Sequence, residues 1–306
     1  MAETDLQDRS YVLITAACNE EDYIEGLISA VVGQNLLPQR WVIVSDRSSD
    51  GTDEIVRRYA AVYPFIELMR LDGSPERDFA SKVYALNAGA EVLKGRHYAF
   101  IGHLDADISF GPTYISQLLD RFVRDPKLGI AGGFIYEKAG ERFKPRLGNR
   151  IRSVAGAVQM FRRECHESLG GMVPLSGGAE DWCAEVMARM NGWRVAAFPE
   201  LEVRHHRRTG YGGNVLPYLY RQGRTEYQIG VHPVFEVFRM LARLPVRPFV
   251  LGAAVQALGY ARAYIRREAR AVPPEFVRFL QAEEMARLWP FRRNGLRSES
   301  GEAGPG

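Results

Sequence analysis

The sequence has 306 residues, of which 46% are hydrophobic and 25% are charged. At about 150 residues per domain, this length predicts one or two domains with a sizeable buried core. Its 30 glycines and 16 prolines are too few for a low-complexity chain, which excludes a disordered tail protein. The three cysteines have no CxxC spacing, so we expect neither a disulfide framework nor a thiolate zinc site. This cysteine usage is typical of a protein in a reducing compartment.

Charge is divided unevenly along the chain, although the formal net charge is only +3. Residues 204–306 contain 17 arginines, no lysine and eight acidic residues. This basic third predicts an anionic partner, either phosphate groups or an anionic membrane surface. We expect no nucleic-acid partner, because no recognised RNA- or DNA-binding motif accompanies the positive charge.

Nothing in the sequence predicts export or a membrane span. The first ten residues are acidic and polar, so we expect no secretory signal and a cytoplasmic protein, placed at most at the inner face of the cytoplasmic membrane. The uncharged apolar stretch 248–261 is shorter than the roughly 20 residues that a spanning helix needs.

Expected strands and helices alternate in the first half of the chain. Short apolar runs predict strands at residues 11–17, 41–45, 66–71 and 98–104. Apolar residues at helical spacing predict helices at residues 20–34, 50–63 and 80–93, the second of them capped by Asp50 or Thr52. Such alternation predicts right-handed crossovers and a mainly parallel sheet.

Polar clusters follow three of these strands, at residues 18–20, 46–49 and 105–107. Ligands of parallel sheets bind beyond the carboxyl ends of the strands. We therefore expect the three clusters to form one ligand-binding rim.

The second half of the chain has a more mixed pattern, with paired glycines and one clear helix at about residues 181–191. From Pro217 onward the chain is expected to be helical, with breaks at the prolines. The expected domain organisation is a flexible N-terminus at 1–10, a catalytic domain at 11–210, a C-terminal helical region at 211–293 and a disordered tail at 294–306.

Asp105 and Asp107 stand directly after an expected apolar strand. Where a strand bends into a loop, both carboxylates can approach one hard cation. An isolated pair of this kind can also be a solvated turn. Its place at a strand end favours a divalent cation site outside the core.

Five motifs occur in order: TAACNEE at 15–21, VIVSDRSSDGT at 42–52, KVYALNAG at 82–89, LDAD at 104–107 and GGAEDW at 177–182. Together they resemble the inverting family 2 glycosyltransferases with a GT-A fold, over about residues 11–206. The resemblance implies an α/β fold with a mainly parallel sheet flanked by helices: a Rossmann-like nucleotide half, a mixed acceptor half and a C-terminal helical extension. It also implies transfer of one sugar from a nucleotide-diphosphate sugar to a glycan or lipid-linked acceptor.

The same resemblance assigns roles to individual residues. The residues that it implies for the donor nucleotide are Thr15, Ala17, Glu20, Asp46, Lys82 and Asp105. A carboxylate such as Asp46 can accept from the imino N–H of uracil or guanine, and Arg47 stands where glycine is commoner. Lys82 would lie near the diphosphate, or else be a solvated helix lysine.

The acidic pair Glu180-Asp181 matches the family's base position. The resemblance implies that Asp181 deprotonates the acceptor hydroxyl and that Glu180 steadies its loop, whereas simple stabilisation of a helix N-terminus is the alternative. Because a metal withdraws electron density from its ligands, the base must be free of metal. The resemblance implies Asp105, Asp107 and His205, preferred to His206, as the ligands of Mn²⁺ or Mg²⁺. The neighbouring arginines at 204, 207 and 208 would neutralise the diphosphate.

Other interpretations stay open. A sugar nucleotidylyltransferase would need glycine and a base in the loop after the first strand, and a catalytically silent scaffold of a polysaccharide-assembly complex would not need both acidic motifs. Residues 221–226 lack the QxxRW box of processive synthases. The stretch 248–261, flanked by arginines, predicts peripheral membrane contact, or else burial against the catalytic domain or in a homodimer interface.

Overall fold

The computed structural model describes residues 8–72, 79–140, 142–207, 215–245 and 248–288. The chain divides into two compact units, Met1–Gly213 and Asn214–Gly306. The expected boundary at residues 210 and 211, residues 1–7 of the expected flexible N-terminus and the expected disordered tail lie outside the described residues.

The first unit contains a mixed sheet whose N-terminal half is parallel, as expected. Four strands, in the spatial order β3-β2-β1-β4, make up this half: β1 (Tyr11–Ala17), β2 (Arg40–Asp46), β3 (Ile66–Leu71) and β4 (Phe100–Leu104). The helices between them are α1 (Ile24–Val32), α2 (Thr52–Ala60) and α3 (Phe79–Leu93). The predicted α/β fold class is therefore confirmed. Helices α1 and α2 are a few residues shorter at their ends than the periodicity suggested, whereas α3 agrees to within one residue.

The second half of the sheet mixes strand directions. Strand β8 (Val158–Arg162) is antiparallel to β4 and to β6 (Leu128–Ala139), which runs parallel to β9 (Arg194–His205). Two shorter strands complete the sheet: β5 (Ile108–Phe110) pairs with β9, and β7 (Arg142–Pro145) pairs with β6. The helices of this half are α4 (Tyr114–Arg124), α5 (Arg163–Ser168) and α6 (Glu180–Met190). Of these elements the sequence had indicated α6.

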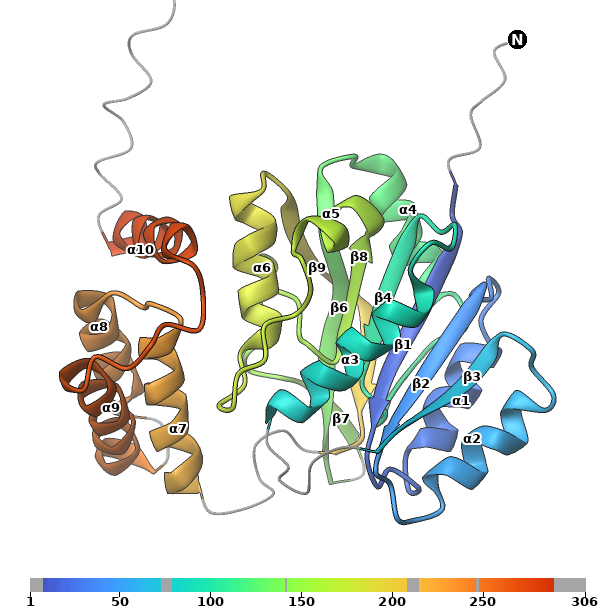
Figure 1. Ribbon diagram of the computed structural model, residues 1–306, viewed down its shortest axis with the longest axis horizontal. Coiled ribbons are helices and arrows are strands. Elements are labelled where there is room, and N and C mark those ends of the chain that lie inside the picture. Colours follow the sequence, from blue (N-terminus) through green and yellow to red (C-terminus); the bar gives the residue numbers. More distant parts are fainter. Residues whose placement is uncertain (1–7, 73–78, 141, 208–214, 246–247, 289–306) are drawn as a thin grey trace, which may run out of the picture. The chain divides into compact units, whose positions relative to one another are not determined.

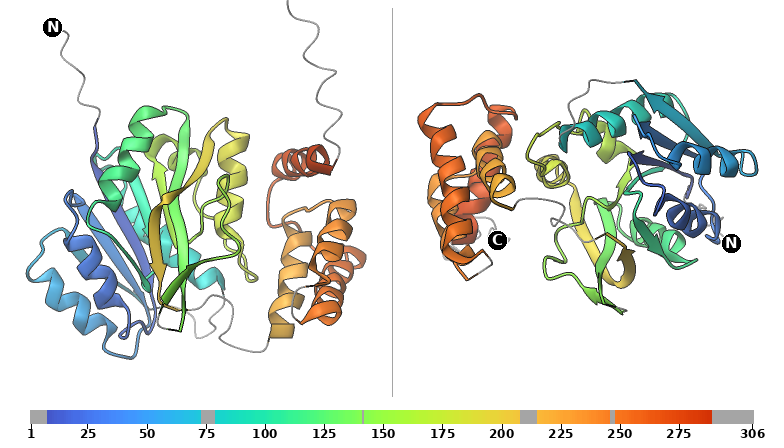
Figure 2. Two further views of the ribbon diagram at one scale, coloured as in Figure 1. Left: turned by 180° about the vertical axis from the view of Figure 1, so that it is seen from behind. Right: turned by 90° about the horizontal axis from the view of Figure 1, so that it is seen from below.

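Helices cover both faces of the sheet (Figures 1 and 2). Alternate residues of β1 point into two separate cores: Leu13 packs with side chains of α1, α2 and α4, and Ile14 with side chains of α3, α5 and α6. Such alternation is the consequence of the two-residue period of a strand. Both faces of β1 are buried, so its sequence is a continuous apolar run rather than an alternating one.

The second unit is helical, with α7 (Val215–Gln228), α8 (Pro233–Arg243), α9 (Phe249–Ile265) and α10 (Pro274–Leu288). Helices α7 and α9 touch through their backbones: a Cβ added at Gly223 would come within 1.9 Å of the Gln256 carbonyl oxygen, and one at Gly259 within 2.1 Å of the Tyr220 oxygen. Only glycine allows this crossing. Within the described ranges, no helix combines the length and apolarity needed to cross a bilayer.

Carboxyl groups are buried at the centre of the second unit. Glu226 accepts hydrogen bonds from Gln256 at 2.8 Å and from Arg239. Glu236 is 4% exposed, and among the described residues no donor lies within hydrogen-bond distance of either of its oxygens. Burial raises the pKa of Glu236 to about 8, with the charge of Glu226 adding to the effect, and burial raises the pKa of Glu284 to about 7.

These raised pKa values predict that the second unit loses stability as the pH rises. Between the ordinary value of 4.5 and about 8, Glu236 ionises in the unfolded chain but stays protonated in the folded one, so the free energy of unfolding falls. We expect the calorimetric Tm of this unit to fall by at least about 5 °C between about pH 6 and pH 9. Glu236→Gln should remove much of this fall, and exposed Glu275→Gln should not. An unchanged pH dependence in Glu236→Gln would contradict the assignment.

Candidate active site

The loops after β1 and β2 are joined at the carboxyl edge of the sheet. Asn19 Oδ1 accepts from the Ser49 backbone N–H at 2.8 Å, and the Glu20 N–H donates to Thr52 Oγ1 at 2.7 Å. Asp50 accepts from both the N–H and the hydroxyl of Thr52. The N-cap of α2 is nevertheless Gly51, without a side-chain cap hydrogen bond, so the prediction of Asp50 or Thr52 as the cap is wrong. Arg47 has a φ of 56°, a left-handed conformation that glycine adopts without strain.

The predicted nucleotide residues at the ends of β1 and β2 are well buried. Thr15 is fully buried, and its Oγ1 accepts from the indole N–H of Trp41 at 3.1 Å. Ala17 ends β1 with 2% of its surface exposed. Both carboxylate oxygens of Asp46 accept from the guanidinium of Arg47, at 2.9 and 3.2 Å. Donor binding by these three residues stays a prediction.

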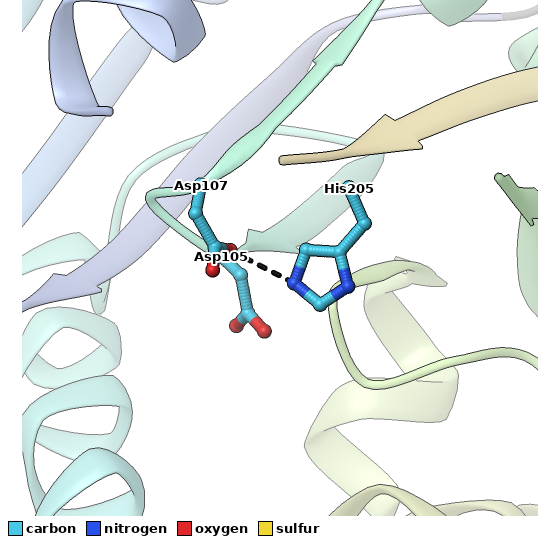
Figure 3. Close-up of side chains that lie close together, drawn as sticks. All are labelled: Asp105, Asp107 and His205. Carbon is cyan, nitrogen blue, oxygen red and sulfur yellow. Dashed lines mark hydrogen bonds and ion pairs between the residues drawn. The ribbon is translucent and has the colours of Figure 1, made fainter. Parts of the chain in front are cut away.

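Asp105, Asp107 and His205 meet where β4, β5 and β9 come together (Figure 3). Asp105 follows β4 directly, and Asp107 precedes β5, whose Ile108 is paired with His205 of β9. One ligand atom from each residue lies within 4.8 Å of the other two. Two carboxylates and an imidazole suit a divalent cation, and the imidazole favours Mn²⁺ over Mg²⁺.

Asp107 is more buried than expected. The sequence predicted that both aspartates lie outside the core, but Asp107 is 8% exposed, because β5 and β9 enclose it. Its Oδ1 lies 3.1 Å from His205 Nε2. Burial opposes the charged form of each group, yet their hydrogen bond and attraction lower the pKa of Asp107 and raise the pKa of His205. The ligand pair is thus held in contact.

Arg207 joins this cluster to the loop after β1. Its guanidinium forms an ion pair with Glu20, lies 3.7 Å from Asp107 Oδ2 and stacks 4.9 Å from the ring centroid of Tyr23. Burial raises the pKa of Glu20, and the charge of Arg207 opposes that rise. Arg207 therefore lies beside Asp107, one of the three candidate cation ligands.

Lys82 lies between the two acidic motifs. Its Nζ is 2.6 Å from Asp105 Oδ1 and 3.8 Å from Glu180 Oε1. Burial disfavours the charged amine, but Asp105 and Glu180 together raise the pKa of Lys82. Burial likewise raises the pKa of Glu180, against the opposing charge of Lys82. Because of these ion pairs, Lys82 is not a solvated helix lysine.

Asp181 is held by backbone donors and not by the cation cluster. Its Oδ2 accepts from the Gly156 N–H at 2.9 Å, and its Oδ1 from the Trp182 N–H at 2.7 Å. The preceding Ala179 has a φ of 79°, a strained conformation for a residue with a side chain. A Cβ at Gly156 would come within 2.8 Å of the Asp181 carboxylate. This position therefore requires glycine.

The sequence patterns did not indicate Gly156, which donates to Asp181, or Glu185, which holds the segment just before Gly156. Glu185 is 1% exposed, and it accepts from the Ser153 hydroxyl at 3.1 Å and from the Val154 N–H. Burial raises the pKa of Glu185 to about 8. Neither residue carries a local signal, because Gly156 lies in an irregular segment and its partner is 25 positions away.

The sequence of this chain is similar to those of known glycosyltransferases. A profile of the family "Glycosyl transferase family 2" matches residues 12–175. The chain is 28% identical over 148 residues to poly-beta-1,6-N-acetyl-D-glucosamine synthase of Staphylococcus aureus, a match covering 48% of this chain and 31% of the synthase. It is 29% identical over 128 residues to the uncharacterized glycosyltransferase YibD of Escherichia coli, covering 39% of this chain and 34% of that protein. Each match thus spans about a third of the relative.

Solved structures share the fold. The mannosyltransferase PcManGT from Pyrobaculum calidifontis, in complex with GDP-Man and Mn²⁺, has a TM-score of 0.53 and 18% identity, covering 92% of this chain and 82% of that one. S. aureus TarS 1–349 in complex with UDP-GlcNAc has a TM-score of 0.53 and 15% identity, covering 91% of each chain. The GT-A fold expected from the motifs is confirmed.

The cation cluster predicts a loss of metal binding when one carboxylate is removed. We expect Asp105→Asn to weaken Mn²⁺ binding at least about tenfold, because an amide is a poorer ligand than a carboxylate. Titration of Mn²⁺ followed by electron paramagnetic resonance, with UDP or GDP present, measures this. Asp22→Asn, an exposed acid on the loop after β1, is the matched control. Equal affinity in Asp105→Asn and the natural protein would contradict the ligand assignment.

Proposed function

This chain belongs to glycosyl transferase family 2, and on that premise we propose that it transfers a single sugar from a nucleotide-diphosphate sugar to an acceptor hydroxyl, with inversion at the anomeric carbon. The acceptor is a glycan or a lipid-linked glycan, in the synthesis of an envelope polysaccharide or glycolipid. The likeness to a polysaccharide synthase supports this acceptor class.

One observation carries the proposal. The candidate metal-binding cluster, through Asp105, and the separate Asp181 carboxylate are hydrogen-bonded to adjacent residues of one segment. The Asp105 N–H donates to the Ala157 oxygen at 3.0 Å, and the adjacent Gly156 N–H donates to Asp181. A direct displacement needs these two functions at a fixed separation, one beside the leaving group and one beside the attacking hydroxyl.

In the proposed reaction the Asp181 carboxylate takes the proton from the acceptor hydroxyl as its oxygen attacks the anomeric carbon. The bond from that carbon to the diphosphate oxygen breaks, and its electron pair leaves with the nucleoside diphosphate. Asp105, Asp107 and His205 would hold a divalent cation, which would supply positive charge beside the leaving diphosphate. Lys82 and Arg207, which lie beside these ligands, add further positive charge.

Backbone donors hold Asp181 ready for this role. They fix the direction of its carboxylate without giving it a cationic partner that would weaken it as a base. Lys82 is turned instead toward Asp105 and Glu180. Glu180 thereby supports the donor side of the site, next to the base.

A screen of nucleotide sugars tests the proposed function. UDP-GlcNAc and GDP-mannose, the donors named for the structural neighbours, are the first candidates. We expect release of nucleoside diphosphate with one donor in the presence of Mn²⁺ or Mg²⁺, and its loss in EDTA. Full activity in EDTA would refute the metal-dependent mechanism, and release of pyrophosphate would indicate nucleotidyl transfer instead.

Asp181→Asn should lower kcat at least about 100-fold and leave the KM for the donor nearly unchanged, because the base acts on the acceptor. Gly156→Ala should lower kcat less, by about tenfold, since its Cβ displaces the Asp181 carboxylate without removing it. Gly26→Ala is the matched control, because a Cβ there meets nothing within 4 Å.

These variants separate the roles. A large rise in the donor KM of Asp181→Asn with little change in kcat would assign Asp181 to the donor. Wild-type kcat in Gly156→Ala would show that its contact does not position the base.

A further inference from the structure

Helix α8 of the second unit exposes its apolar side chains and buries a charged one. Val234, Val237 and Leu241, which recur at helical spacing, are exposed, Val237 with 59% of its surface. The opposite side carries Glu236, which is buried among the other helices. A helix of an ordinary globular unit turns its apolar stripe inward and its charges outward.

Helix α9 repeats this inversion. Val250, Leu251, Leu258 and Ile265 are exposed, Leu258 with 60% of its surface. Its inward side consists mostly of small residues, among them Gly252, Ala253 and Gly259, together with buried Gln256. Phe238, in the middle of α8, and Leu244, directly after its end, are also exposed. The apolar patch comprises Val234, Val237, Phe238, Leu241, Leu244, Val250, Leu251, Leu258 and Ile265.

Positive charge accompanies the apolar patch. Asn214–Gly306 contains 14 arginines, no lysine and eight acidic residues. Three of those acids, Glu226, Glu236 and Glu284, are buried, so they contribute little to the charge that faces solvent. Arg262 follows Leu258 by one helical turn, and Arg266 follows Ile265. Both are exposed, and neither forms an ion pair with another residue of the described part of the chain.

We propose that the α8–α9 face binds an anionic lipid surface, with the apolar patch entering the headgroup boundary and the arginines contacting lipid phosphates. Apolar area and basic charge are the two contributions that hold a helix in the plane of such an interface. A second copy of the chain would also cover apolar area, but it would bring the same excess of arginines to the contact. Charge complementarity therefore favours the lipid over a second copy.

Vesicle flotation of the full chain tests this proposal. The probes are vesicles of phosphatidylcholine alone and vesicles in which about one third of the lipid is phosphatidylglycerol. We expect binding to the anionic vesicles at about 50 mM salt, and binding at least about tenfold weaker on neutral vesicles or at about 0.5 M salt.

Two double variants separate the two contributions. Leu241→Ser with Leu258→Ser should weaken binding at least about tenfold without changing charge. Arg262→Gln with Arg266→Gln should weaken it by on the order of tenfold or more, since each base strengthens binding about fivefold. Val62→Ser, at a 68% exposed apolar position of the first unit, should bind like the natural protein. All are exposed positions, and thermal unfolding verifies that each variant folds.

Three results would overturn the proposal. The first is no binding to anionic vesicles at low salt, and the second is equal binding to neutral and anionic vesicles. The third is a loss of binding in Val62→Ser as large as in the leucine variant. Sedimentation that shows a dimer, dissociated by Leu241→Ser with Leu258→Ser, in a protein that does not bind vesicles would assign the patch to a second copy.

Discussion

The active site depends on two adjacent backbone groups at the start of β8. The Asp105 N–H donates to the Ala157 oxygen, and the Gly156 N–H donates to Asp181, so both the proposed cation ligands and the proposed base are attached to one dipeptide. Because β8 is paired with β4 immediately beyond this point, the dipeptide cannot shift without disturbing the sheet. The absence of a side chain at Gly156 is what allows the Asp181 carboxylate to approach.

Charge holds the two halves of the sheet together at the same edge. Lys82 of α3 lies between Asp105 and Glu180, and Arg207 lies between Glu20 and Asp107. Each of these two basic side chains thus lies between carboxylates from distant parts of the sequence. Glu20, Asp107 and Glu180 are buried, so loss of the basic partner would leave a buried carboxylate uncompensated, which costs more than loss of an ion pair between two exposed groups. Lys82 and Arg207 therefore stabilise the shape of the site, in addition to their proposed role of adding positive charge beside the leaving diphosphate.

Periodicity was sufficient to predict the first half of the sheet, because β1 to β4 are short apolar runs separated by helices of regular spacing. It failed in β6, where Gly132 and Gly133 interrupt the pattern. A Cβ at these two positions would come within 2.5 Å of the Val158 oxygen and 2.1 Å of the Leu201 oxygen, contacts that depend on neighbouring strands. The motifs indicated Asp105, Asp107 and His205 as ligands. The burial of Asp107 was not predictable, since it depends on the pairing of β5 with a strand nearly 100 residues away.

The glycine crossing of α7 and α9 has a consequence for how the second unit can change. Backbone contact at Gly223 and Gly259 sets the distance between these helices, and most of the buried positions of α9 are occupied by glycine or alanine. The large outward side chains contribute little to this packing. Substitutions among them can therefore accumulate at small cost in folding free energy, and the chemistry of the outer face can drift or be engineered while the helical framework stays the same.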